Sequence, residues 1–140
     1  MRTGLPTTQQ VLIRTPIRLC IYLSNTKTYW YQMARYDLQG SLDLLVLKTL
    51  SQRGKLHGYG IVQHIQRASD ELLCVEEGSL YPALHRMQQS GWIASEWALT
   101  ETGRRAKYYR LAAAGRKRLE QAVGDFEELV RGVRAVLQYA

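Results

Sequence analysis

The sequence predicts a mainly α-helical protein with one small β-hairpin, arranged as a winged helix-turn-helix followed by a long C-terminal dimerisation helix. Three observations predict this fold. Four segments repeat apolar residues at helical spacing. Two short runs of strand-forming residues lie between the third and fourth of these segments. The last segment keeps a heptad pattern of apolar residues, which is typical of a helix that pairs with another helix.

We expect three parts along the chain. Residues 1–36 carry five basic side chains and no acidic one, and are expected to form a poorly ordered extension. Residues 37–112 are the expected winged-helix DNA-binding domain, and residues 113–140 the dimerisation helix. A cationic segment without acids also fits a targeting peptide, a membrane anchor or a DNA-binding arm. Because Met33 directly precedes the first strong helix signal, we favour translation from Met33 instead.

The first helix is expected from Ser41 to Gln52. Ser41 is suited to cap its N-terminus, and Gly54 ends it. Four apolar residues repeat at helical spacing: Leu42, Leu45, Val46 and Leu50. Leu44 and Leu47 widen the apolar side of this helix. A second helix is expected from His57 to Ala68, with an inner face of Ile61, Val62, Ile65 and Ala68. The short apolar run from Leu72 to Val75 fits a stub of strand.

The third helix carries the most informative surface. We expect Ser79 to cap it, Pro82 to fall in its first turn, and Gly91 to end it. Three residues face the core: Leu80, Leu84 and Met87. The other face is polar and free of acids: Tyr81, Pro82, His85, Arg86 and Gln89. Such a face suits a groove lined by phosphates, although an ordinary solvated face remains the alternative.

Two strand-like runs follow, from Trp92 to Trp97 and from Lys107 to Leu111, joined by residues 98–106. The connection carries Arg104 and Arg105, so the predicted hairpin has a basic tip. A basic hairpin after a helix-turn-helix is the layout of a winged helix, whose wing contacts phosphates or a minor groove. A solvated tip is the alternative. Seven basic residues and no acid lie between positions 104 and 118.

The fourth helix is expected from Ala113 to Gln138. Its apolar residues step alternately by four and three: Leu119, Val123, Phe126, Val130, Val133 and Leu137. A second row follows at a spacing of seven: Ala122, Leu129 and Val136. Two rows exceed what a small domain needs to bury, so we expect this helix to pair with a second copy of the chain. A monomer that covers the helix by itself is the alternative.

Composition and motifs disfavour other classes of protein. The net charge of +7 favours an anionic partner. We find no catalytic set, no nucleotide-binding glycine motif and no metal-ligand spacing, so no catalytic residue, cofactor or metal site is expected and the protein is not expected to be an enzyme. No run of 18 apolar residues predicts a membrane span. Cys20 and Cys74 form no CxxC pair, which fits a reducing, cytoplasmic location.

The chain resembles the PadR family of bacterial transcriptional regulators, and four pieces carry the resemblance. They are Leu44–Leu47, His57–Ile61, Glu77–Met87 with Gly91–Ile93, and Arg104–Leu111 with Ala114–Gly115. The third and fourth pieces, in this order and spacing, are specific. With a single C-terminal helix, the chain resembles the short subgroup of the family. Residues 1–32 have no counterpart in the usual pattern of the family.

The resemblance implies that the third helix enters the major groove of a pseudo-palindromic operator on double-stranded DNA. By position, Ser79, Tyr81, Pro82, His85, Arg86 and Gln89 lie on that helix, Tyr59 matches a phosphate contact, and Arg104, Arg105 and Lys107 match the wing. It implies a homodimer that represses transcription. Some members release DNA when a small molecule binds, so an unknown effector is a further expected partner. A winged-helix module that binds other proteins without DNA is the alternative function.

Overall fold

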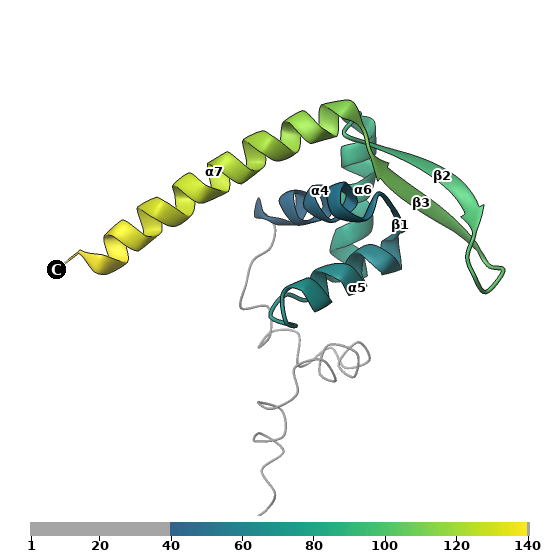
Figure 1. Ribbon diagram of the computed structural model, residues 1–140, viewed down its shortest axis with the longest axis horizontal. Coiled ribbons are helices and arrows are strands. Elements are labelled where there is room, and N and C mark those ends of the chain that lie inside the picture. The colour runs from purple at the N-terminus through teal and green to yellow at the C-terminus, as the bar shows by residue number, and fades with distance from the viewer. Residues whose placement is uncertain (1–39, 140) are drawn as a thin grey trace, which may run out of the picture.

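The computed structural model describes residues 40–139, and Figure 1 shows their arrangement. Three helices, α4 (Leu42–Arg53), α5 (Gly58–Ala68) and α6 (Glu77–Gln89), pack together beside a three-stranded antiparallel sheet. The sheet consists of β1 (Lys55–His57), β2 (Ile93–Leu99) and β3 (Arg105–Leu111), with β3 in the middle. A long helix, α7 (Ala113–Gln138), crosses α4 and projects beyond it. This mainly helical winged-helix fold confirms the predicted fold class.

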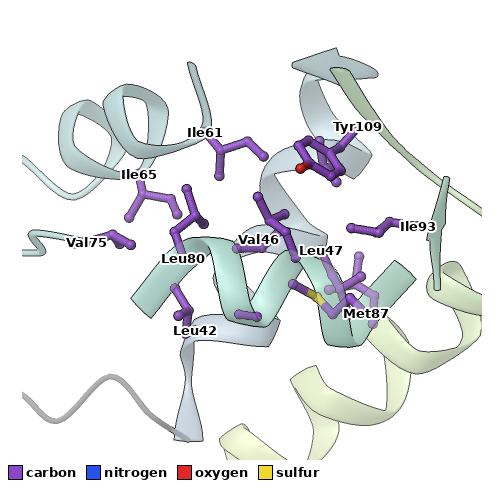
Figure 2. Packing of buried hydrophobic residues seen from close by; sticks show 14 residues of the cluster. Leu42, Val46, Leu47, Ile61, Ile65, Val75, Leu80, Met87, Ile93 and Tyr109 are labelled. Carbon is purple, nitrogen blue, oxygen red and sulfur yellow. The ribbon is translucent and has the colours of Figure 1, made fainter. Parts of the chain in front are cut away.

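The core lies between α4, α5, α6 and the sheet, and Figure 2 shows its packing. Helix α4 is buried on more than one side, as its apolar pattern predicted, and its Val46 and Leu47 are completely buried. The sheet contributes Ile93 from β2 and Tyr109 from β3. Burial raises the pKa of the Tyr109 phenol, with a smaller contribution from the neighbouring Tyr81.

The start of α6 differs from the prediction. The helix begins at Glu77 rather than after Ser79, because the Glu76 carbonyl accepts hydrogen bonds from the Ser79 and Leu80 N–H groups at 3.1 and 2.9 Å. Ser79 therefore lies inside the first turn and does not cap the helix. Pro82 lies in the second turn instead of the first, where it removes one helical hydrogen bond.

Three further expectations about helices and loops need correction. Ser41 stands at the N-cap position of α4 but makes no side-chain capping bond. Ala68 is exposed and does not belong to the inner face of α5. The run from Leu72 to Val75 forms no strand, and follows two residues with left-handed backbone, Asp70 and Glu71, that turn the chain after α5.

The sheet has one strand more and a longer hairpin than the sequence predicted. The short strand β1 pairs with β3, placing Leu56 opposite Tyr109. Strands β2 and β3 stay paired as far as Leu99 and Arg105, so the connection shrinks from residues 98–106 to residues 100–104. A bond from the Gly103 N–H to the Thr100 carbonyl (2.9 Å) closes this turn, and Gly103 adopts a φ of 78° that glycine allows.

Helix α7 has the predicted bounds but serves two purposes along its length. Leu119 is buried in the core of its own chain, and Val123 packs against that core. Beyond Val123, Val130 is half-buried, and the other large apolar residues are all exposed: Phe126, Leu129, Val133, Val136 and Leu137. No helix within residues 40–139 is long and apolar enough to cross a membrane. The expectations for residues 1–36, Met33 and Cys20 lie outside the described residues.

Candidate nucleic-acid interface

The outer side of α6 is the first part of the candidate interface. Leu80, Ala83, Leu84 and Met87 anchor one side of this helix in the core. The opposite side is therefore presented to solvent, since successive residues turn by about 100° around a helix. All six side chains that the sequence singled out on α6 are exposed there: Ser79, Tyr81, Pro82, His85, Arg86 and Gln89.

Tyr81 lies on the flank of α6 that faces α5. Its hydroxyl is seated against Gly58, and a Cβ at Gly58 would lie only 2.9 Å from that oxygen. Gly58 thus allows α6 and the N-terminus of α5 to approach closely. The ring of Tyr81 remains 48 % exposed, so it borders the outer surface.

The N-terminus of α5 carries the second predicted tyrosine. His57 caps this helix, since its Nδ1 accepts a hydrogen bond from the Gly60 N–H at 3.0 Å. Tyr59 stacks on the His57 ring with an interplanar angle of 13°, and is itself exposed. Tyr59 and Tyr81, from two helices, therefore flank one helix N-terminus whose N–H groups and dipole favour an anion.

Arg86 lies on the other flank of α6, which faces α4. Its guanidinium donates a hydrogen bond to the Asp43 carboxylate at 2.5 Å. The side chain of Arg86 is nevertheless 57 % exposed. One of its five donors is used within the chain, and Asp43 offsets its charge.

The hairpin formed by β2, β3 and residues 100–104, here called the wing, carries the second part of the candidate interface. Arg104 and Arg105 are exposed near its tip, and Lys107 is half-buried. The Arg105 guanidinium lies 5.0 Å from the centre of the Trp97 ring, and Trp97 itself is exposed. This cation–π contact holds the Arg105 charge on the surface of the wing.

The basic residues between positions 104 and 118 do not form one patch. Arg104, Arg105 and Lys107 belong to the wing, whereas Arg116, Lys117 and Arg118 lie on the first turns of α7. Strand β3, which carries Arg110 between the two groups, spans about 20 Å, given a rise of about 3.3 Å per residue. On the outer face of the sheet, Lys55 pairs with Glu96, which lowers the pKa of that carboxyl group.

The expected dimerisation residues divide into two sets. Leu119 and Val123 pack within their own chain, as described above. Phe126, Val133 and Leu137 are exposed, and Val130 is half-buried. The exposed set forms one side of a helix segment that no other described element covers, so it remains free for a partner.

One contact and one exposed surface at the candidate interface were not foreseen from the sequence. Asp43 in the first turn of α4 pairs with Arg86, 43 positions away, and no local pattern in the sequence indicates this contact. The exposure of Trp97 and Leu99 was also missed. In β2 the small residue Ala98 lies between Trp97 and Leu99, and this alternation of large and small side chains could have shown a strand continuing beyond the core. Within residues 40–139, no group of three or more potential ligands could hold a metal ion.

Known proteins share this fold and sequence pattern. Residues 46–121 match the sequence model of a protein family described as the transcriptional regulator PadR-like family. A transcriptional regulator from Clostridium thermocellum is 31% identical, with a TM-score of 0.63, and the match covers 70% of this chain and 94% of that one. A PadR-like regulator from Bacillus cereus is 28% identical with a TM-score of 0.62, and the match covers 74% and 97% of the two chains.

A relative in sequence points the same way. A transcriptional regulator of Mycobacterium tuberculosis is 35% identical over 79 residues, which span 56% of this chain and 70% of that protein. The part of this chain that matches the family runs from α4 into α7. It therefore includes α6, the wing and the start of the long helix.

Proposed function

Because the chain belongs to the PadR-like family of transcriptional regulators, we propose that it binds a pseudo-palindromic DNA operator as a homodimer and represses transcription there. The observation that carries the proposal is the outer face of α6 between Tyr81 and Gln89, which is exposed and free of acidic residues. We assign this face to the major groove, where side-chain donors distinguish base pairs. A regulator of this kind acts at the chromosome, and we expect it in the cytoplasm.

The remaining contacts are assigned by their place around α6. Pro82, His85 and Gln89 are at the middle of the exposed face, and we assign them to the base edges. Tyr59 and Tyr81 border the N-terminus of α5 and suit a phosphate. Ser79 and Arg86 lie on the flank of α6 that faces α4, and we assign them to the phosphates on that side. We assign Arg104, Arg105 and Lys107 to phosphates or the minor groove beside the wing.

The uncovered apolar side of α7 supports the dimer. A contiguous exposed apolar surface of this kind is unfavourable in water, and a second copy of the same helix would cover it. Two recognition helices related by a two-fold axis would then face the DNA about one turn, ~34 Å, apart. A small-molecule effector remains part of the proposal, without assigned residues.

The proposal is tested by selecting fragments of genomic DNA with the purified protein and sequencing them. We expect enrichment of a two-fold sequence motif upstream of one or a few genes. Binding to that motif should weaken steeply with salt, because phosphate contacts release counterions. Absence of any enriched motif, together with duplex binding that is undetectable at low salt, would favour the protein-interaction module instead.

Replacing Arg104 and replacing His85 should have different consequences for binding. We expect Arg104→Ala to weaken binding to all sequences alike and to reduce the salt slope by about one. His85→Ala should instead change the preferred base at one position of each half-site, with a cost of about 1–3 kcal/mol at the preferred sequence. Titrating both variants against operators with single base changes checks this. The division between positioning and base contacts is wrong if the two variants lose affinity in parallel.

Removing the charge of Asp43 should strengthen non-specific binding. We expect Asp43→Asn to release Arg86 for phosphates, raise affinity for random duplex severalfold and steepen the salt slope by up to about one. The fold should tolerate the change, because exposed ion pairs contribute only about 0–1 kcal/mol. Asp70→Asn after α5 is the matched control, since it removes the same charge at an exposed position away from Arg86 and from the apolar side of α7. Equal effects of the two variants would show that net charge, not the Arg86 contact, is responsible.

A further inference from the structure

Trp92 joins the end of α6 to the beginning of α7 through its backbone. After the C-cap Ser90 and Gly91, the Trp92 N–H donates to the Met87 carbonyl in the last turn of α6 at 3.0 Å. The Trp92 carbonyl accepts from the N–H of Ala112, the N-cap of α7, at 2.9 Å. One residue is therefore hydrogen-bonded to the last turn of one helix and to the N-cap of the other.

Side-chain contacts extend this joint along α7. The Arg118 guanidinium lies 5.3 Å from the centre of the Trp92 ring. Between them, Gly115 is buried, and a Cβ at this position would lie 2.0 Å from the Trp92 carbonyl oxygen. The backbone of α7 thus rests directly on Trp92, and Arg118 holds the ring from the next turn.

We propose that Trp92 is a positioning residue that fixes the angle between α6 and α7, and thereby selects the spacing between operator half-sites. This inference rests on the proposed function, in which α6 contacts DNA and α7 pairs the two chains. The separation of the two α6 helices in such a dimer depends on how each chain connects α6 to α7. Helix α7 also packs against α4, and Trp92 adds the direct link from α6 to α7 through both its backbone and its ring.

A rigid connection should make the protein sensitive to spacing. Each added base pair rotates one half-site by about 34° relative to the other, as follows from about 10.5 base pairs per turn. A dimer with a fixed angle between α6 and α7 can follow that rotation only by straining the protein or the DNA. A dimer with a loosened joint can adapt, and would bind several spacings with similar affinity.

The test compares binding to operators whose centre is lengthened or shortened by one and two base pairs. We expect the wild-type protein to prefer one spacing by at least about tenfold, which corresponds to about 1.4 kcal/mol. Trp92→Leu and Arg118→Ala should reduce that ratio to about threefold or less, while base preferences within each half-site stay unchanged. Lys117→Ala is the matched control, because it removes an exposed neighbouring charge that does not contact Trp92. It should leave the wild-type spacing ratio unchanged.

Retention of the wild-type spacing ratio by both Trp92→Leu and Arg118→Ala would overturn the inference, provided that both variants keep the wild-type helix content. A measurement without DNA separates this outcome from failure of the proposed function. Spin labels carried on unnatural amino acids at position 89 should give one narrow distance between the two chains of the wild-type dimer. The distance distribution should broaden in Trp92→Leu and Arg118→Ala but not in Lys117→Ala. An unchanged distribution would overturn the inference alone, whereas no interchain distance at all would show that the proposed dimer does not form and would overturn both.

Discussion

Replacing Gly115 by alanine is expected to lower the free energy of unfolding by about 3 kcal/mol or more, because the new methyl group has no room. Its carbon would lie 2.0 Å from the Trp92 carbonyl oxygen and 2.8 Å from Leu111 Cδ1. The oxygen belongs to the backbone and accepts the Ala112 N–H bond, so relief requires α7 to move away from the domain. We expect the midpoint of thermal unfolding to fall by roughly 10 °C or more.

The same helix offers a matched control for this prediction. Gly124 also lies in α7, but nothing is within 4 Å of the position where its Cβ would lie. Gly124→Ala should raise the free energy of unfolding by up to about 1 kcal/mol, because alanine is the better helix former. Thermal and denaturant unfolding of the two variants should thus change in opposite directions. A Gly115→Ala protein as stable as the wild type would show that α7 does not rest on Trp92 as described.

Placing a carboxylate at Phe126 should convert the proposed dimer into a monomer. Phe126 is 44 % exposed within one chain and lies in the apolar row that we assign to the partner helix. Burying an unpaired charge in such an interface costs several kcal/mol, so Phe126→Asp should weaken dimerisation by at least about 100-fold. Operator affinity should fall by a similar factor, because each monomer then binds one half-site alone. Sedimentation over a concentration series and operator titrations measure the two effects.

Gln121→Asp is the control for Phe126→Asp, since Gln121 lies on the polar side of α7 and is exposed. This variant adds the same charge and should remain dimeric. Unfolding of the Phe126→Asp monomer should begin with the end of α7, because an uncovered helix segment is only marginally stable in water. A Phe126→Asp protein that still sediments as a dimer would place the interface elsewhere on the chain.

Periodicity in the sequence predicted the four helices and the hairpin, and the local signals at their ends were less reliable. Gly54 ends α4 as expected, whereas Ser79 was given a capping role that its place inside α6 excludes. A serine before an apolar run resembles a cap, but the Glu76 carbonyl already starts the helix three residues earlier. The strand β1 was missed because three residues are too short for alternation to be recognised, and only its pairing with β3 reveals it.

Exposure of the candidate interface could be predicted, but its internal contacts could not. His85 and Gln89 follow from helical spacing once the core side of α6 is known. The pairing of Arg86 with Asp43 joins residues of different helices, and no local pattern encodes it. The same holds for Tyr81 against Gly58 and for Trp92 against Gly115. Each of these contacts depends on how two elements pack, which a single sequence specifies only through the complete fold.

The most direct test of this account is the mass of the complex that the wild-type protein forms with its selected operator. The central claim is that α7 pairs two chains so that two α6 helices bind one two-fold site. Sedimentation or native mass spectrometry should therefore give two chains per duplex, and a duplex with one half-site destroyed should bind much more weakly. One chain per intact operator, or equal binding to intact and half-destroyed sites, would contradict the claim.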